Sequence, residues 1–277
     1  MTIRLARQTT DVARLPLHDH PSNHGLAYQN VTFRSTDGLT LRGWYLPSLR
    51  DDRCIILVQG EEHHRNSPGI RALELGGELV ARGYSVLLFD LRARGESDGQ
   101  RSSAGNQELL DVMAAIAYVK HRGIVARRIG LLGFSLGAVL AIYAALREPE
   151  IPCLVCDSPF SDLLDDFRHL RLGPAPVPGW LSAALVVLMA KTLYGSDPGQ
   201  MRPIKAISKL HPRPIFFIHG EDDVVVSPQE TLALWRQYHN PANRLWIAPG
   251  AGHVHTYSVA GEEYVRQVVD FFDSCIG

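Results

Sequence analysis

Short apolar runs and amphipathic segments alternate along most of the chain. Six runs have strand length, and the continuous ones are typical of parallel strands buried on both faces. The segments between them space apolar residues as one face of a helix does. The strand-length runs cover residues 54–58, 84–89, 128–132, 153–156, 214–218 and 244–248, and the helical segments cover 70–81, 106–120, 138–146, 228–238 and 262–272.

The first part of the chain has a different pattern. Residues 28–34 and 39–47 alternate apolar and polar positions, and Asp37-Gly38 lies between them. This pattern predicts an antiparallel hairpin, which fits the edge of a sheet. Together the segments predict an α/β fold: a mostly parallel, twisted sheet of about eight strands with helices on both faces.

One region departs from this alternation. Between residues 158 and 212 no strand is evident, and prolines precede an apolar helical segment at 180–193. We interpret 159–210 as a small helical cap inserted into a single domain spanning 1–277; an ordinary core helix is the alternative. Trp180, Leu185 and Leu188 are the expected apolar wall of a substrate pocket.

Charge and hydropathy narrow the class of protein. Lys plus Arg number 28 against 29 Asp plus Glu, which gives no argument for a nucleic-acid or anionic membrane partner. The first eight residues lack an apolar core of signal-peptide length, and the longest apolar run, 180–190, is too short to span a bilayer. We therefore expect a cytoplasmic protein without a membrane partner.

Cys153 and Cys156 form a C-x-x-C pair, but the pair lies in a predicted strand. Residues three apart on a strand point to opposite faces, so one metal ion cannot bind both thiols. The chain's four cysteines fit reduced residues better than a disulfide framework.

A G-x-S-x-G motif, Gly133-Phe134-Ser135-Leu136-Gly137, separates the strand-length run at 128–132 from the helix at 138–146. Strand, motif and helix are the context of a nucleophile elbow, in which glycines allow close approach of the chain. Ser135 would also lie at a helix N-terminus, where free N–H groups favour developing negative charge. The motif predicts a nucleophilic serine; a Gly-rich turn with an incidental serine is the alternative.

Carboxylates and histidines follow the later predicted strands. Asp223 lies just after the run at 214–218, and His253 lies after the run at 244–248. Nucleophile, acid and base in this order are typical of a serine triad on such a sheet. His253 would accept the Ser135 proton, and Asp223 would hold the imidazole in the required tautomer.

Several motifs occur together in a fixed order, and they are Asp90-Leu91-Arg92 with Gly95-Glu96-Ser97, Asp157-Ser158-Pro159-Phe160, Arg202-Pro203-Ile204, His219-Gly220-x-x-Asp223 and Pro249-Gly250-Ala251-Gly252-His253. Over about residues 28–273 the chain resembles the α/β-hydrolase superfamily, and within it the Bem46-like and serine-aminopeptidase-like hydrolases. The resemblance implies Asp223 as the acid rather than Asp222, with Asp157 as the alternative. For the base we favour His253 over His255, because His253 directly follows the Gly-Ala-Gly turn. Asp90 and Arg92 are expected to tie loops together.

The oxyanion hole should use the backbone N–H of Leu136, directly after the nucleophile. The resemblance implies that Glu61 supplies the second N–H. Relatives usually have His-Gly where this chain has Gln59-Gly60, and our hypothesis is that the Gln59 side chain braces this loop by hydrogen bonds. The segment 61–64, Glu-Glu-His-His, lacks the spacing of a metal site, so we expect no metal and no cofactor.

These features predict a serine carboxylesterase that cleaves small to medium esters with apolar acyl groups through an acyl-enzyme. The same residues would serve amide, peptide or thioester hydrolysis. A hydrolase fold used only for binding is the alternative from another class. Epoxide hydrolases and dehalogenases on this fold use aspartate at the nucleophile position, so Ser135 argues against them. The expected partner is a small-molecule ester, and the sequence does not set the oligomeric state.

Overall fold

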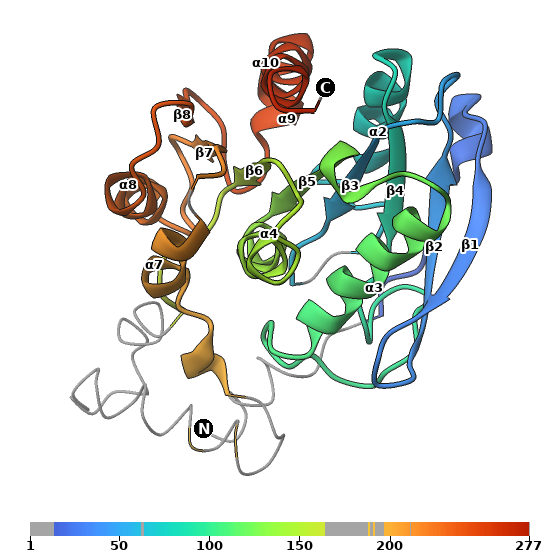
Figure 1. Ribbon diagram of the computed structural model, residues 1–277, viewed down its shortest axis with the longest axis horizontal. Coiled ribbons are helices and arrows are strands. Elements are labelled where there is room, and N and C mark those ends of the chain that lie inside the picture. Colours follow the sequence, from blue (N-terminus) through green and yellow to red (C-terminus); the bar gives the residue numbers. More distant parts are fainter. Residues whose placement is uncertain are drawn as a thin grey trace.

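A computed structural model of the chain describes residues 14–61, 64–163, 188, 191, 197–210 and 212–276. Among these residues, eight strands form one sheet in the order β1-β2-β4-β3-β5-β6-β7-β8 (Figure 1). This mostly parallel, eight-stranded sheet confirms the predicted fold class. The strands are β1 (Gln29–Arg34), β2 (Thr40–Leu46), β3 (Cys54–Val58), β4 (Ser85–Phe89), β5 (Ile129–Phe134), β6 (Leu154–Asp157), β7 (Ile215–Gly220) and β8 (Arg244–Ala248).

The predicted hairpin forms the antiparallel edge of the sheet. β1 pairs with β2 from Gln29 opposite Tyr45 to Arg34 opposite Thr40, and β2 also runs antiparallel to β4. The pairs from β4 and β3 through to β7 and β8 are parallel. The carboxyl ends of β3, β5, β6, β7 and β8 therefore share one edge, where chemistry gathers in sheets of this kind.

Helices cover both faces of the sheet (Figure 1). One layer packs on the face that holds Ile56 and Val58 of β3, and the other packs on the face that holds Ile55 and Leu57. The first layer contains α3 (Glu108–His121), α4 (Leu136–Arg147) and α8 (Pro228–Gln237), and the second contains α2 (Ala72–Ala81), α9 (Thr256–Ala260) and α10 (Glu262–Asp273). The short elements are η1 (Pro21–His24), η2 (Ala126–Arg128), η3 (Pro198–Gln200), α7 (Pro203–Ala206) and η4 (Ile207–Leu210).

The C-x-x-C pair divides between the two layers. Cys153 packs with the α2 and α10 core, whereas Cys156 packs with the α3 and α4 core. Both thiols are buried and free. This arrangement confirms that the pair faces opposite sides of the strand.

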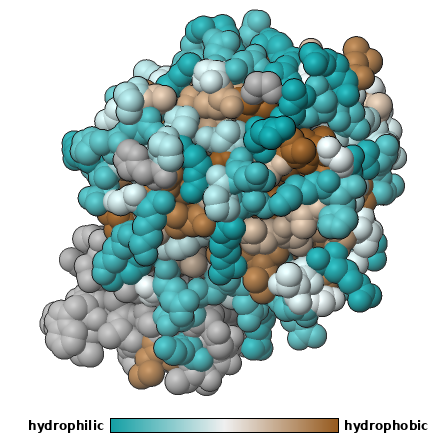
Figure 2. All heavy atoms as spheres, viewed as in Figure 1, coloured by the Kyte–Doolittle hydropathy of each residue, from teal (hydrophilic) through white to brown (hydrophobic). Residues whose placement is uncertain are grey.

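Most of the predicted cap lies outside the described residues, including Trp180 and Leu185. Leu188 is described, and 56% of its surface is exposed. On the face drawn in Figure 2, hydrophilic residues cover most of the described surface; apolar residues lie mainly in the recesses between them, and a few protrude at the edge. In the described part of the chain, no helix is both long and apolar enough to cross a membrane.

Candidate active site

The sharp turn between β5 and α4 positions Ser135. Ser135 has φ 53° and ψ −119°, a conformation that costs a non-glycine residue strain energy. A Cβ on Gly133 would lie 2.3 Å from the carbonyl oxygen of Gly137, and a Cβ on Gly137 would lie 2.0 Å from that of Val58. Both glycines of the motif are therefore required by close backbone contact, as the sequence predicts.

Three of the predicted site residues come together at the carboxyl edge of the sheet. Nε2 of His253 lies 3.0 Å from Oγ of Ser135, and Nδ1 of His253 lies 2.7 Å from Oδ2 of Asp223. A carboxylate accepts hydrogen bonds and does not donate them, so these partners assign the proton to Nδ1 and leave Nε2 as the acceptor from the serine hydroxyl. The arrangement provides a hydroxyl, a base and a carboxylate in one hydrogen-bonded chain.

The environment of Asp223 favours its ionised form. Oδ1 accepts hydrogen bonds from the backbone N–H groups of Val225 and Val226, each at 2.9 Å. Burial alone would raise the pKa of Asp223, but hydrogen bonds from His219, His253 and Val226 outweigh it and hold the pKa well below its usual range. Asp223 is therefore ionised at neutral pH and can stabilise the imidazolium form of His253.

Asp157, the alternative acid, has other partners. Its Oδ1 accepts a hydrogen bond from the Ser158 hydroxyl at 2.9 Å, and its Oδ2 accepts one from the Tyr264 hydroxyl at 3.0 Å. The Ser158 hydroxyl oxygen also accepts from the N–H of Val254 at 3.3 Å. Asp157 is therefore connected to the loop that carries His253, but in the described part of the chain neither of its oxygens is hydrogen-bonded to an imidazole.

The loops that carry the acid and the base press directly on each other. A Cβ on Gly220 would lie 2.3 Å from the carbonyl oxygen of Ala251, and the N–H of Asp222 donates to that oxygen at 2.9 Å. This contact explains why glycine precedes the acid by three residues. The backbone contact alone therefore keeps the two loops at a short distance from each other.

The two predicted oxyanion donors lie on either side of the elbow. Among the described residues, the N–H of Leu136 has no hydrogen-bond partner. It belongs to the first turn of α4, where N–H groups have no acceptor within the helix. Glu61 is held by the buried guanidinium of Arg94: Nε of Arg94 donates to the Glu61 carbonyl oxygen at 2.5 Å, and Nη2 pairs with the Glu61 carboxylate at 3.0 Å. Sequence reasoning did not identify Arg94 as the residue that holds this loop.

The hypothesis that Gln59 braces the loop is wrong. The Gln59 side chain is 1% exposed, and in the described part of the chain neither its Nε2 nor its Oε1 has a hydrogen-bond partner. Asp90 and Arg92 do tie loops together, as expected: Asp90 Oδ1 accepts from the backbone N–H of Arg65 at 2.7 Å, and Nη1 of Arg92 donates to Asp37 in the β1–β2 turn at 2.7 Å. The described residues contain no cluster of three or more His, Cys, Asp or Glu side chains that could hold a metal ion.

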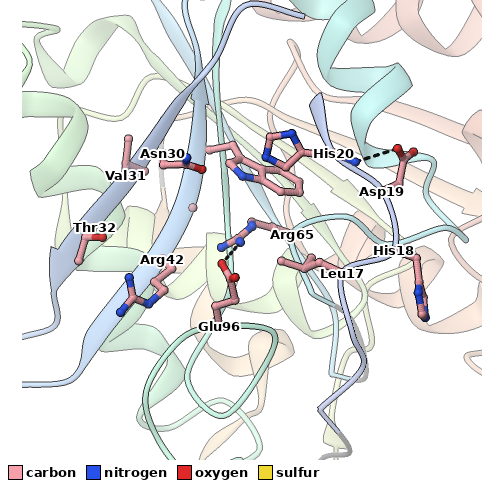
Figure 3. Close-up of a pocket in the computed structure, with 12 residues that line it drawn as sticks. Leu17, His18, Asp19, His20, Asn30, Val31, Thr32, Arg42, Arg65 and Glu96 are labelled. Atoms are coloured by element: carbon pink, nitrogen blue, oxygen red, sulfur yellow. Dashed lines mark hydrogen bonds and ion pairs between the residues drawn. The ribbon is translucent and has the colours of Figure 1, made fainter. Parts of the chain in front are cut away.

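A hollow of about 520 Å³ lies over the β1–β2 hairpin (Figure 3). Trp44 and Arg42 of β2 line it, and Arg65 and Glu96 from the loops after β3 and β4 form an ion pair beside them. None of its lining residues belongs to the Ser135 site. It is therefore not the substrate pocket predicted under the cap, for which Trp180, Leu185 and Leu188 remain the expected wall.

Known proteins resemble the chain in sequence and in fold. The uncharacterized protein YqkD of Bacillus subtilis is 27% identical over 246 residues, which cover 87% of this chain and 77% of that protein. The esterase Pf2001 of Pyrococcus furiosus superposes with a TM-score of 0.77 at 27% identity, covering 96% of this chain and all of that one. Est1E of Butyrivibrio proteoclasticus, solved with ferulic acid bound, has a TM-score of 0.70 at 20% identity over 89% of this chain and 99% of its own, which shows the fold alone.

A match to a protein-family model identifies the family of the chain. The model of the X-Pro dipeptidyl-peptidases (S15 family) matches residues 20–212, more than half of the sequence. The matched range contains Ser135 and ends before Asp223 and His253. With the sheet order, the superposed esterase and this match, the chain belongs to the X-Pro dipeptidyl-peptidase (S15) family and is a hydrolase of the α/β-hydrolase superfamily.

Proposed function

We propose that the protein is a serine carboxylesterase that cleaves small to medium esters with apolar acyl groups through an acyl-enzyme. The observation that carries the proposal is the hydrogen-bonded chain from Ser135 through His253 to Asp223, with Ser135 on a strained elbow. In such a chain the histidine removes the serine proton at neutral pH, and the resulting alkoxide character makes the serine a nucleophile.

In the acylation step, Oγ of Ser135 attacks the ester carbonyl carbon while Nε2 of His253 takes the hydroxyl proton. The carbonyl oxygen becomes an oxyanion, for which the N–H groups of Leu136 and Glu61 are the proposed donors. His253, now an imidazolium stabilised by Asp223, then gives the proton to the leaving alkoxide. The products of this step are an alcohol and an ester of Ser135.

Deacylation repeats these roles with water in place of Ser135. His253 takes a proton from the water, the resulting hydroxide attacks the acyl carbonyl carbon, and the proton returns to Oγ of Ser135. The carboxylic acid leaves and the enzyme is restored. Asp223 keeps Nδ1 of His253 protonated through both steps, which is required if Nε2 is to act as the base.

Two observations support an ester with an apolar acyl group. The superposed Pf2001 is an esterase, and its identity to this chain over nearly the whole length is 27%. Val224 and Val225, next to Asp223, leave 97% and 67% of their surfaces exposed. Exposed valines beside the acid offer apolar contact area to an acyl chain or to the predicted cap.

Peptide hydrolysis is the second candidate, and the match to the X-Pro dipeptidyl-peptidases favours it. The same nucleophile, base and oxyanion donors would cleave an amide. A dipeptidyl-peptidase must also bind the free amino group of its substrate, and no cluster of acidic side chains was evident for this purpose in the sequence. We therefore place the ester first.

The deciding experiment compares three classes of substrate with one purified protein. A fluorophosphonate probe with mass spectrometry locates the activated serine, and p-nitrophenyl esters of acyl lengths from two to twelve carbons are compared with Xaa-Pro p-nitroanilides. We expect labelling at Ser135 and the highest kcat/KM on an ester. Preference for the anilides would establish the peptidase instead.

Ser135→Ala is the matched control because it removes the nucleophile and leaves the elbow backbone unchanged. Loss of a triad nucleophile costs on the order of a millionfold in turnover elsewhere. Retention of a tenth of the wild-type activity by Ser135→Ala would refute the assignment. A wild-type protein that neither reacts with the probe nor turns over any substrate would favour the binding-only alternative.

A further inference from the structure

A second histidine, His219, lies close to the carboxylate of Asp223. His219 is the last residue but one of β7, and it is fully buried. Its Nε2 lies 3.0 Å from Oδ2 of Asp223, the oxygen that also accepts from Nδ1 of His253 at 2.7 Å. One carboxylate oxygen thus lies between two imidazole nitrogens.

The partners of His219 assign the proton that faces Asp223. Nε2 has two acceptors within reach, Oδ2 of Asp223 and the carbonyl oxygen of Val226 at 2.9 Å. A nitrogen that meets only acceptors must carry a proton. Nδ1 lies 2.6 Å from Oγ1 of Thr231 in α8, whose hydroxyl can donate to it. His219 is therefore held from both sides: its Nε2–H donates to the Val226 carbonyl oxygen, and Oδ2 of Asp223 lies 3.0 Å from the same nitrogen as a second acceptor.

His219 also acts on Asp223 through the backbone. Its Nε2 binds the carbonyl oxygen of Val226, and the N–H of Val226 donates to Oδ1 of Asp223 at 2.9 Å. Both oxygens of the carboxylate are thus fixed by groups that His219 contacts or holds. The titratable carboxyl of Asp157 on the neighbouring strand also interacts electrostatically with both His219 and His253.

We propose that His219 is a positioning residue for the Ser135 site: its Nε2–H orients Asp223 and moderates how strongly that carboxylate attracts the proton of His253. This inference rests on the proposed function, because it assigns a role within the same hydrogen-bonded chain. A carboxylate that shares its charge with two donors pulls less on each. Without His219, Oδ1 of Asp223 would still accept from the N–H groups of Val225 and Val226, but Oδ2 would lose one of the groups that orient it and would stabilise the His253 imidazolium more strongly.

Two substitutions separate this role from mere packing. His219→Gln keeps an amide N–H near the position of Nε2, whereas His219→Asn is one methylene shorter and reaches only the Thr231 side. We expect His219→Asn to lower kcat by about ten- to a hundredfold with little change in KM, as for loss of one hydrogen bond to a charged group. We also expect it to move the acid limb of the pH–kcat/KM profile to higher pH. His219→Gln should restore both values to near wild type, and His255→Asn, in the same loop as His253, should leave them unchanged.

A measurement on the resting enzyme keeps the inference separate from the proposed function. The low-field proton resonance of the His253–Asp223 hydrogen bond is observed by NMR without substrate. It should shift in His219→Asn and keep its position in His219→Gln. Unchanged resonance and unchanged pH profile in His219→Asn would overturn the inference, as would equal losses in both variants with a matching fall in Tm. An inactive wild type whose resonance still responds in this way would overturn the proposed function and leave the positioning role supported.

Discussion

The Tyr264 hydroxyl of α10 donates a hydrogen bond to Oδ2 of Asp157 at the end of β6, over a distance of 3.0 Å. With the Ser158 hydroxyl on Oδ1, this bond occupies both carboxylate oxygens. Asp157 and Asp223 follow neighbouring parallel strands, but only Asp223 reaches His253. The two carboxylates therefore have different partners: Asp157 accepts from a hydroxyl of a distant helix, whereas Asp223 accepts from the imidazole of His253.

This separation predicts unequal effects of two matched substitutions. Asp223→Asn should lower kcat by about four orders of magnitude, because an amide no longer holds the required tautomer of His253. Asp157→Asn should keep kcat within about tenfold, since Asp157 supports only the loop that carries His253. Steady-state rates on one good ester, with a thermal melt for each variant, test both expectations. A severe loss in Asp157→Asn with a mild loss in Asp223→Asn would reverse the assignment.

The stability of the two variants should depend on pH in opposite directions. The pKa of Asp223 is lowered in the folded protein, so its ionised form contributes stability above the unfolded value near 3.8. That contribution is lost as the pH falls below about 4. Asp223→Asn should therefore be less stable than wild type at pH 7, and the difference should shrink toward pH 3. Urea unfolding at several pH values measures it; a constant difference would contradict the linkage.

The contribution of Asp157 to stability changes with pH in the opposite direction. Burial raises its pKa against the hydrogen bonds from Ser158 and Tyr264, so folding favours the protonated carboxyl. The resulting stability is present below the unfolded pKa and is lost as the pH rises through the folded one. Asp157→Asn stays neutral, so it should gain stability relative to wild type as the pH rises from about 4 to 7. The same urea series tests this, and a relative loss at pH 7 would show that the ionised form is favoured.

The sequence predicts the sheet well because its strands are continuous apolar runs. All six runs outside the hairpin form strands, and their ends shift by only one or two residues. The run at 128–132 extends to Phe134 because the chain stays in the sheet up to the elbow itself. The helix α9 at Thr256–Ala260 is missed because five residues are too few for a helical period to appear.

The sequence predicts the three reacting residues of the candidate site but not the residues that support them. Ser135, Asp223 and His253 follow strand ends, so the parallel topology alone brings them to one edge. The residues that hold them are joined by contacts distant in sequence, such as Tyr264 with Asp157 and Arg94 with Glu61. Periodicity and motifs carry no information on such pairs. A polar residue in an otherwise buried stretch is the one available signal, and it does not identify its partner.

The Gln59 side chain was expected to form hydrogen bonds, and it forms none within the described part of the chain. Its buried amide has no hydrogen-bond partner among the described residues, and such groups cost roughly 1–3 kcal/mol each. Gln59→Leu should therefore raise the free energy of unfolding by about 1 kcal/mol or more and leave kcat unchanged. Gln59→Glu should destabilise the protein, because it buries an unpaired carboxylate. Urea unfolding and ester turnover on both variants test this, and a loss of turnover in Gln59→Leu would restore the bracing hypothesis.

Arg94 takes the bracing role that Gln59 lacks. Its side chain is 1% exposed, and its guanidinium joins the Glu61 carbonyl oxygen to the carbonyl oxygen of Arg92 at 2.9 Å. If Glu61 supplies an oxyanion N–H, the orientation of that group depends on this fork of donors, which lysine cannot reproduce. Arg94→Lys keeps the charge beside Glu108 and should lower kcat about tenfold or more with little change in KM, because loss of a whole oxyanion donor costs about a hundred- to a thousandfold.

Arg92→Lys provides the matched control. Arg92 is an equally buried arginine two residues away, but it binds Asp111 and Asp37 and does not contact Glu61. Arg92→Lys should therefore lower Tm while the folded enzyme keeps a kcat within about twofold of wild type. Turnover is compared per fluorophosphonate-reactive site, so that unfolded protein does not count. If the two variants lose kcat equally, Arg94 only stabilises the fold; a selective loss in Arg94→Lys ties the oxyanion loop to this one guanidinium.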